Sequence, residues 1–557
     1  MLAVWKSLAR SFLAANIAAG VASGAPPHYR IIWNQWVDGP SCVLADGDVV
    51  FGADGAVKRW SGGETTPIVK SGQRVDGARI QLVADWGIGW GAAKDGDVFA
   101  PCWIDRTPLG PSAGLLACLP RRTPALWLET GDDLPGGGKM RGLVPFGLAP
   151  SDAGRTFINV LQSRETEQEG EMQEALLVLT ADASARGRRV DVLFRTGDPA
   201  QGGSDRFSSS FSSWSMCAPF ADEQGRCMIL AHVRSEPVYM DLGGRDTLWR
   251  WSEARGLERL LDPNVRNVDG WAATPIYNAS MTRGGVFAIV ATLFKPGVTS
   301  RNAILVFDAF DAQTPRIAAI EGETTDQGTI RRICCVGVNE SGSIAFGAQL
   351  TPRGQTTLDE RLFVYHRRRQ GTTKLVYAPN ECAFPAPCRF AVPLWQAPEC
   401  LDDDRVYFNG EEFDWNWHAW GLYAFDAGDA GDRVPRRVLH ETQWPSRGYP
   451  VVLGGGSDSG APMRLSNGAG RVVVASDIGI AIVDSRLAAC TCDLTCDGVV
   501  DWQDFFWFFW QYDIMDCADN AMVDWCDADF DRDGLVDDGD FAIFASVFGE
   551  GACPSIE

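Results

Sequence analysis

The segment Asn339-Glu-Ser-Gly-Ser-Ile-Ala-Phe346 joins a polar turn to a strand-forming run, and this combination recurs along the chain. Asp and Asn suit the turn because their side chains hydrogen-bond to nearby backbone groups, and Gly adopts positive φ without strain. The β-branched and aromatic residues that follow favour a strand. Eight copies lie between residues 29 and 487, with turns at 46–47, 95–96, 152–154, 222–225, 283–285, 339–342, 402–404 and 467–470.

A second motif ends several of these units. It is clearest in Pro67-Ile-Val-Lys-Ser-Gly72, Leu126-Trp-Leu-Glu-Thr-Gly131 and Val192-Leu-Phe-Arg-Thr-Gly197. The units recur every 50 to 70 residues, which is room for four short strands and their turns. Self-similarity at this period indicates radial blades or a solenoid, and the lack of a helix-length amphipathic stretch favours an all-β fold. We therefore expect a β-propeller over residues 29–487 with eight blades, and a seven-bladed ring with an added decoration is the alternative.

The two ends of this repeat region complement each other. The eighth unit stops after Arg471–Ser476 and Gly479–Asp484 without a closing strand, whereas the strand-like segment from Tyr29 to Val37 belongs to no unit. An unpaired sheet edge invites aggregation, so natural proteins cover it. We predict that residues 29–37 supply the missing outer strand and close the ring.

Two cysteine pairs fall near expected hairpins. Cys217 and Cys227 flank the turn at 222–225, and Cys102 and Cys118 flank the next hairpin of the second unit. Residues directly opposite each other in an antiparallel pair come close enough for a disulfide. We expect each pair to face across its hairpin.

The beginning of the chain and its cysteine content indicate export. Lys6 and Arg10 precede the short apolar stretch Ser11–Ala22, and Val21-Ala22-Ser23 offers a small-residue cleavage site, which is the layout of a secretory signal peptide over residues 1–25. A buried N-terminal helix is the alternative. The sixteen cysteines suit an oxidising compartment, and no later run reaches the roughly 18 apolar residues of a membrane span. We expect a monomeric bacterial protein, secreted or at the cell surface, without a transmembrane span.

The negative charge is concentrated at the C-terminus. Residues 490–557 hold fifteen Asp, two Glu and one Arg, and so carry −16 of the chain's formal net charge of −22. So dense an acidic segment repels itself unless cations bind in it. A nucleic-acid partner would require a basic surface, and the acidic character of the chain argues against one.

Two windows in this acidic segment match the calcium loop of an EF-hand. Such a loop needs oxygen ligands at positions 1, 3, 5, 9 and 12, a backbone carbonyl at position 7, and Gly at position 6. Both windows also carry Val at position 8, at Val500 and Val536, where it can anchor the loop to a core. The predicted ligands of the first loop are Asp493, Thr495, Asp497, Val499, Asp501 and Asp504. Those of the second loop are Asp529, Asp531, Asp533, Leu535, Asp537 and Asp540.

We therefore expect two calcium sites, because a hard cation prefers clustered oxygen ligands. A pair of acidic turns without metal is the alternative. The second loop offers five carboxylates and the first offers four with a Thr hydroxyl, so the second site is expected to bind more tightly. Cys490, Cys492 and Cys496 are expected to form disulfides rather than a zinc site, because no His lies near them.

These loops resemble the dockerin family, in which two loop–helix repeats form one calcium-dependent domain. The resemblance rests on Asp at position 12 (Asp504 and Asp540), on the apolar stretch after each loop, and on Gly549-Glu-Gly-Ala-Cys553, which looks like a GC-type dockerin tail. It covers residues 490–557 and implies a small α-helical domain that docks to a cohesin-like or cell-surface protein. The aromatic run Phe505–Trp510 and the extra cysteines between Asp513 and Asp527 depart from the family pattern. We expect the aromatic run to be a buried helix core, with a partner-binding face as the alternative.

The repeat region is similar, more weakly, to uncharacterised propeller-like regions that precede such tails in exported bacterial proteins. The residues that carry this likeness are the Thr-Gly-Asp strand ends, such as Thr196-Gly197-Asp198, and the recurring turns. The likeness implies no known activity.

Residues that indicate catalysis are scarce. The five His are scattered among the units, and no nucleophile elbow or metalloprotease motif is present. The Asp residues at blade turns are interpreted as turn formers, and Trp clusters such as residues 415–420 suit either core packing or stacking on a carbohydrate. We expect a non-catalytic binding or structural propeller. The alternative is an extracellular carbohydrate-active hydrolase or lyase with a dockerin-type appendage, since such enzymes can work with carboxylates alone.

Overall fold

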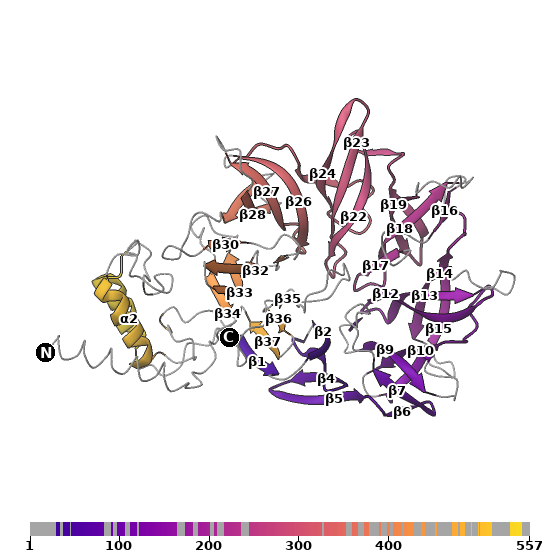
Figure 1. Ribbon diagram of the computed structural model, residues 1–557, viewed down its shortest axis with the longest axis horizontal. Helices are drawn as coiled ribbons and strands as arrows, with labels where there is room; N and C mark the ends of the chain where they lie inside the picture. Colours follow the sequence, from indigo (N-terminus) through magenta and orange to yellow (C-terminus); the bar gives the residue numbers. More distant parts are fainter. Residues whose placement is uncertain are drawn as a thin grey trace.

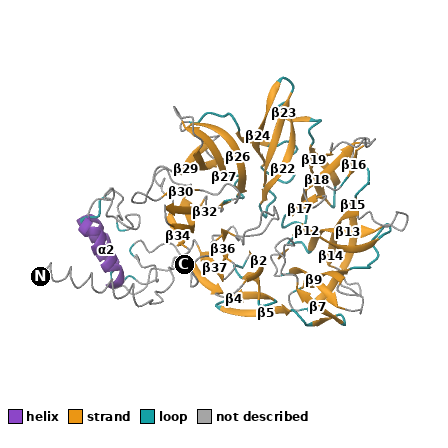
Figure 2. Ribbon diagram, viewed as in Figure 1, coloured by secondary structure: helices purple, strands orange, loops and turns teal. Residues whose placement is uncertain are grey.

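In the computed structural model the described residues are mainly β-strands, and the helices among them follow the last strand in the chain (Figure 2). The description begins at Tyr29 and ends at Phe548. The expected signal peptide lies outside it. Within these limits the residues left undescribed are 34–36, 45, 83–90, 93–96, 106–111, 120–121, 164–172, 182–187, 201–204, 209–216, 236–243, 326–327, 353–358, 366–372, 378–388, 392–397, 401–404, 415–416, 427–435, 441–451, 454–470, 477–478, 485–491, 493–499, 501, 515–527 and 529–534.

The described strands form eight antiparallel sheets that succeed one another along the chain and around a ring (Figure 1). This is the architecture of a β-propeller, and we number the sheets as blades 1 to 8. Blade 1 contains β2 (Val37–Val43), β3 (Val49–Ala53), β4 (Ala56–Ser61) and β5 (Glu64–Lys70). Blade 2 contains β6 (Arg74–Val75), β7 (Ala78–Leu82), β8 (Gly91–Ala92), β9 (Val98–Asp105), β10 (Ser112–Cys118) and β11 (Ala125–Glu129).

Blades 3 to 5 follow in chain order. Blade 3 contains β12 (Lys139–Pro150), β13 (Arg155–Ser163), β14 (Gln173–Ala181) and β15 (Arg188–Arg195). Blade 4 contains β16 (Asp205–Phe207), β17 (Cys217–Ala221), β18 (Cys227–Ser235), β19 (Gly244–Ser252) and β20 (Gly256–Leu261). Blade 5 contains β21 (Arg266–Val268), β22 (Trp271–Met281), β23 (Phe287–Lys295), β24 (Val298–Phe307) and β25 (Arg316–Ile320).

The last three blades return to the start of the chain. Blade 6 contains β26 (Gly328–Val338), β27 (Ile344–Pro352), β28 (Asp359–Tyr365) and β29 (Thr373–Tyr377). Blade 7 contains β30 (Arg389–Ala391), β31 (Glu399–Cys400), β32 (Arg405–Asp414), β33 (Trp417–Asp426) and β34 (Arg436–His440). Blade 8 contains β35 (Val452–Leu453), β36 (Arg471–Ser476), β37 (Gly479–Asp484) and β1 (Tyr29–Trp33).

The N-terminal strand completes the last blade. β1 pairs with β37, with Tyr29 opposite Val483, so blade 8 has the order β1-β37-β36-β35. The predicted closure is therefore confirmed for residues 29–33, while β2 of blade 1 already begins at Val37. The eight sheets among the described residues agree with the eight units expected.

The recurring turns join the first and second long strands of a blade. In blade 4 the backbone N–H of Asp222 donates to the carbonyl of Arg226 at 3.0 Å, and in blade 6 that of Asn339 donates to Ser343 at 3.1 Å. The side chain of each turn residue accepts a second bond from the residue four positions on, at 2.8 and 2.9 Å. Gly342, at φ 78°, completes the blade 6 turn. In these turns the Asp and Asn are turn formers, as interpreted.

The strand-end motif links neighbouring blades. Gly197 donates its N–H to the carbonyl of Phe207 at 2.8 Å, and Phe207 donates back to Asp198 at 3.1 Å. The same bond joins Gly131 to Met140 at 2.8 Å. The motif repeats in sequence because it fastens the outer strand of one blade to the inner strand of its neighbour.

The two expected cysteine bridges are wrong. Cys227 lies opposite Ala221 across the hairpin, four residues from Cys217. In blade 2, Cys102 and Cys118 are likewise four residues out of register. Directly opposite positions are required because a disulfide spans only about 6 Å between Cα atoms. Cys102, Cys118 and Cys227 are instead buried thiols in the blade cores.

Candidate functional site

The C-terminal module carries the predicted metal ligands and has an internal duplication. Its helices are α2 (Trp502–Ile514) and α3 (Asp538–Val547), whose starts lie 36 positions apart. Figure 1 shows α2 to one side of the ring. The buried core of the module consists of three pairs with the same 36-residue separation, Cys492 with Ala528, Val500 with Val536, and Phe508 with Phe544.

Aromatic contacts reproduce this duplication in space. The rings of Phe508 and Phe544 stack at 5.2 Å between centroids. Phe505 contacts Phe544 at 6.0 Å, and Phe541, its counterpart 36 positions later, contacts Phe508 at 5.9 Å. The two helices therefore meet across an approximate twofold axis, which two copies of one loop–helix unit would produce.

The aromatic run of α2 is buried on one side only. Phe508 is 1% exposed, whereas Phe506 is 47% exposed and Trp502, at the start of the helix, 63%. The expectation of a buried core thus holds for Phe508 and is wrong for Phe506. Sequence could not separate them because every position of the run is apolar.

Two predicted ligands are fully buried at equivalent places. Asp504 in α2 and Asp540 in α3 have no exposed surface and lie 36 positions apart. Asp540 accepts the backbone N–H of Asp537 at 2.9 Å, and Asp537 accepts that of Gly539 at 2.7 Å, which forms a capping box at the start of α3. The side chain of Leu535, expected to bind through its carbonyl, is 41% exposed. The remaining predicted ligands lie outside the described residues: Asp493, Thr495, Asp497, Val499, Asp501, Asp529, Asp531 and Asp533.

The donor set of this site suits a hard cation. The described residues of the module include no Lys or Arg, and they include the fully buried carboxylates of Asp504 and Asp540. Burying a carboxylate is costly unless a counter-charge or hydrogen bonds accompany it. Burial, together with the charge of Asp504, raises the pKa of Cys492 to about 11, so in the absence of a metal this thiol is protonated at neutral pH. Among the described residues no cluster of three His, Cys, Asp or Glu side chains forms a metal site by itself.

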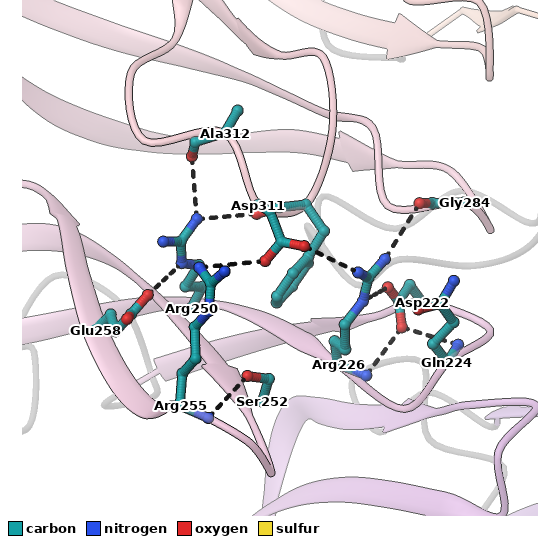
Figure 3. Close-up of polar contacts among 11 residues, drawn as sticks. Asp222, Gln224, Arg226, Arg250, Ser252, Arg255, Glu258, Gly284, Asp311 and Ala312 are labelled. Carbon is teal, nitrogen blue, oxygen red and sulfur yellow. Dashed lines mark hydrogen bonds and ion pairs between the residues drawn. The ribbon is translucent and has the colours of Figure 1, made fainter.

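A polar network joins the turns of blades 4 and 5 (Figure 3). Asp222 is fully buried and accepts the guanidinium of Arg226 at 2.6 Å. Burial raises the pKa of Asp222, and its bonds to Arg226 and Gln224 oppose that rise. Arg226 and Arg255 lie on either side of Asp311, with N–O distances of 3.7 and 3.4 Å. Arg226 also donates to the carbonyl of Gly284 at 3.4 Å, so the network joins the two blades.

Gly285, next to this network, has a positive φ and leaves no room for a side chain. Gly285 has φ 91°, and a Cβ there would lie 2.9 Å from the Cβ of Phe310 and 3.0 Å from a nitrogen of Arg226. The ring of Phe310 in turn faces the Arg226 guanidinium at 4.3 Å. A side chain at this turn would separate the blades.

Blade 4 also brings together polar residues that are distant in sequence. Nδ1 of His232 on β18 lies 2.8 Å from a carboxylate oxygen of Asp246 on β19. On its other side, the carbonyl of His232 accepts the N–H of Ser208 at 3.0 Å, which sets Ser208 opposite His232. Two residues further along, Arg206 lies opposite Arg234. In the sequence, His232 is one of five scattered His and no motif distinguishes it. Its neighbours on the adjacent strands are determined by strand register.

Comparisons with known proteins identify no family. No family model matches the chain, and no curated protein matches it. Among solved structures, the Dos1 propeller has 11% identity and a TM-score of 0.39, with 84% of this chain and 96% of that chain covered. The polysaccharide lyase Uly1 has 11% identity and a TM-score of 0.38, with 83% and 99% covered.

The β-propeller domain of a trilobed protease from Pyrococcus furiosus has 11% identity and a TM-score of 0.31, with 68% and 87% covered. These scores are too low to assign a fold or a function. Both assignments therefore rest on the chain's own strands and side chains. Neither α2 nor α3 is long and apolar enough to cross a membrane.

Proposed function

We propose that this chain is an exported binding or structural propeller that docks outside the cell through a calcium-dependent, dockerin-like C-terminal domain. The observation that carries the proposal is the 36-residue separation shared by the core pairs and by the buried Asp504 and Asp540. A duplicated loop–helix unit with a buried carboxylate at the same place in each copy is what a pair of calcium loops requires. The ring supplies the binding surface and the C-terminal domain supplies attachment, to a cohesin-like or other cell-surface protein.

Each calcium ion would be held by one of the two ligand sets predicted from the sequence. Asp504 and Asp540 would close the two cages from the first turns of α2 and α3. Calcium would place positive charge beside these buried carboxylates, and its binding would stabilise the folded module. Docking would then depend on calcium because the ions would stabilise the fold in which α2 and α3 pack together.

Calorimetric titration of the full chain with calcium tests this proposal. The unmodified protein should take up two ions, and Asp504→Asn and Asp540→Asn should each take up one fewer, because each removes the buried ligand of one loop. Asp538→Asn is the matched control, since Asp538 is exposed, bonds to the hydroxyl of Tyr512 at 2.6 Å and is not a predicted ligand. Absence of calcium uptake by the unmodified chain would contradict the proposal.

A further inference from the structure

The inner strands of blades 1, 3 and 5 carry extra residues at corresponding places. In blade 3, residues 144–147 of β12 lie opposite the single residue Asn159 of β13. In blade 5, residues 276–278 of β22 lie opposite the single residue Val290 of β23. Blade 1 has residues 38–40 of β2 at the corresponding place. Extra residues leave the strand ladder, and such bulges are common beside binding sites, so we call these three segments the inserts.

The inserts lie at the end of the ring opposite the recurring turns. The inner strands of blades 5 and 6 lie side by side, because Oδ1 of Asn278 accepts the N–H of Val336 at 3.0 Å. At the turns that follow these strands, Glu340 accepts the hydroxyl of Thr282 at 2.7 Å. Both bonds join residues 58 positions apart, so the two strands run in the same direction from insert to turn. The turn ends are therefore joined to each other, and the inserts are at the other end of the strands.

The inner strands continue this arrangement around the ring. A Cβ on Gly337 in β26 would overlap the carbonyl oxygen of Pro398, the residue before β31 of blade 7. On the other side of the ring, β8 of blade 2 contacts β2 and β12, and β12 contacts β17 of blade 4. Figure 1 shows β2, β12 and β17 on the inner side of the ring. The inserts are therefore distributed around one end of the ring's axis.

The blade 5 insert presents an apolar and a polar side chain close together in the chain. Ile276 is 37% exposed, although it belongs to an inner strand. Asn278 uses only its Oδ1 in the bond to Val336, so the two N–H donors of its Nδ2 take no part in that bond. A binding site for a small ligand combines apolar contact with a few placed polar groups. A sugar ring offers C–H groups to the first and hydroxyls to the second, so this pair of side chains matches a carbohydrate.

The sequences of the inserts favour an uncharged ligand. Those of blades 3 and 5 are Val144-Pro-Phe-Gly147 and Ile276-Tyr-Asn278, and neither contains a charged residue. Each includes one aromatic residue, a type that provides a large contact area in binding sites. The formal net charge of −22 on the whole chain repels a polyanion.

We propose that the blade 5 insert forms a binding site for an uncharged polysaccharide, extended along the same end of the ring by the blade 3 insert. Ile276 contacts the C–H groups of a sugar ring, and Asn278 donates its Nδ2 hydrogens to sugar hydroxyls. The inference rests on the proposed binding role of the ring and names its ligand class. It does not depend on the calcium sites.

Affinity electrophoresis of the full chain, with calcium present throughout, tests the site with dextran, galactomannan, hydroxyethylcellulose and the anionic polymer polygalacturonate. The unmodified protein should be retarded by at least one neutral polymer and not by polygalacturonate. Ile276→Ser should weaken that binding about tenfold, equivalent to about 1.4 kcal/mol, because it removes the apolar contact. Asn278→Asp should weaken it to a similar extent, because a carboxylate still accepts the N–H of Val336 but cannot donate to a hydroxyl.

Val298→Ser is the matched control. Val298 is 43% exposed and begins β24 of the same blade, so this change removes apolar surface away from the insert. The proposal is overturned if the unmodified chain binds no neutral polymer, binds polygalacturonate as tightly, or loses as much affinity with Val298→Ser as with Ile276→Ser. The unfolding temperature is measured for each variant, and Asn278→Asp decides the outcome should Ile276→Ser destabilise the ring. Calcium uptake measured on the same samples separates failure of this site from failure of the docking proposal.

Discussion

Asp222 holds Arg226, the side chain that connects blade 4 to blade 5. Its two carboxylate oxygens accept the backbone N–H groups of Gln224 and Arg226 and the Arg226 guanidinium. Asp222→Ala should destabilise the chain by about 3 kcal/mol or more, because it leaves Arg226 without its buried partner. Asp222→Asn keeps an acceptor for the backbone groups and should cost about 1–2 kcal/mol. Urea unfolding followed by circular dichroism measures both.

The control for Asp222 is another acid of the same network. Asp311 is 58% exposed, and its two ion pairs are 3.4 and 3.7 Å long. Asp311→Asn should change stability by less than about 1 kcal/mol, because exposed ion pairs contribute little. Equal losses for the two acids would show that burial does not determine the importance of Asp222.

The buried thiols give a second residue-scale prediction. Burial raises the pKa of Cys102 and Cys118 to about 12 and that of Cys227 well above its usual value. Iodoacetamide at pH 8 should therefore leave these three unmodified in the folded chain and alkylate them in urea, as peptide mass spectrometry will show. Between about pH 9 and 12 the unfolded thiols ionise while the folded ones stay protonated, so their contribution to stability should fall as pH rises. A mass that shows two of them bridged would contradict this.

At the scale of elements, β1 is the strand whose loss should be most informative. It pairs with β37 and is the outer strand of blade 8. Without residues 29–33, β37 has an open edge, and the first and last blades lose the chain segment that links them, although their buried side chains still pack together. A chain that begins at residue 34 should therefore show faster limited proteolysis within residues 471–484 and a lower unfolding temperature than one that begins at residue 29. Equal behaviour of the two chains would show that ring closure does not need this strand.

The pair of helices permits a matched comparison within one turn of α2. Phe508 stacks on Phe544 in the core of the C-terminal module, whereas Phe506 is exposed. Phe508→Ala should cost about 3–5 kcal/mol of the module's stability, because it removes a fully buried ring and leaves a cavity. Phe506→Ala should change it by no more than about 0.5 kcal/mol. Calorimetry with calcium present measures the unfolding transition of the module in each variant. A larger loss of stability for Phe506→Ala than for Phe508→Ala would place the core on the other face of the helix.

At the scale of the whole molecule, the ring and the C-terminal module should respond separately to chelation. Among the described residues, the buried clusters of the blades share no member with the module core, whose buried members are Cys492, Val500, Phe508, Ala528, Val536 and Phe544. Differential scanning calorimetry with a calcium chelator should lower or remove the module's transition, because its buried carboxylates lose their counter-charge. The ring's transition should stay within about 1–2 °C. A single transition that moves as a whole would show that the two parts unfold together.

Part of this structure could be predicted because local chemistry determines it. The turns at 222–225 and 339–342 are specified by residues that hydrogen-bond to their own neighbours, and the Thr-Gly-Asp ends repeat because each makes the same bond to the next blade. The number of recurring turn–strand units, eight, equals the number of sheets. The 36-residue spacing of the acidic loops is equally local, and the buried positions of Asp504 and Asp540 follow it.

The positions of the cysteines across their hairpins and the polar neighbours of His232 in blade 4 could not be predicted from local sequence. A shift of four residues in register separates Cys217 from Cys227 across a hairpin, and no local signal reports it. The meeting of Arg206, His232 and Arg234 depends on the pairing of β16 with β18, although β17 lies between these strands in the chain.

The sequence by itself determined the strands, their turns, the number of blades and the places of the predicted calcium ligands, because each depends on residues close together in the chain. Only the tertiary structure decided which side of α2 is buried, which cysteines remain thiols and which polar side chains of blade 4 share a face. These depend on strand register and on packing between elements, where the energies come from contacts between residues far apart in sequence.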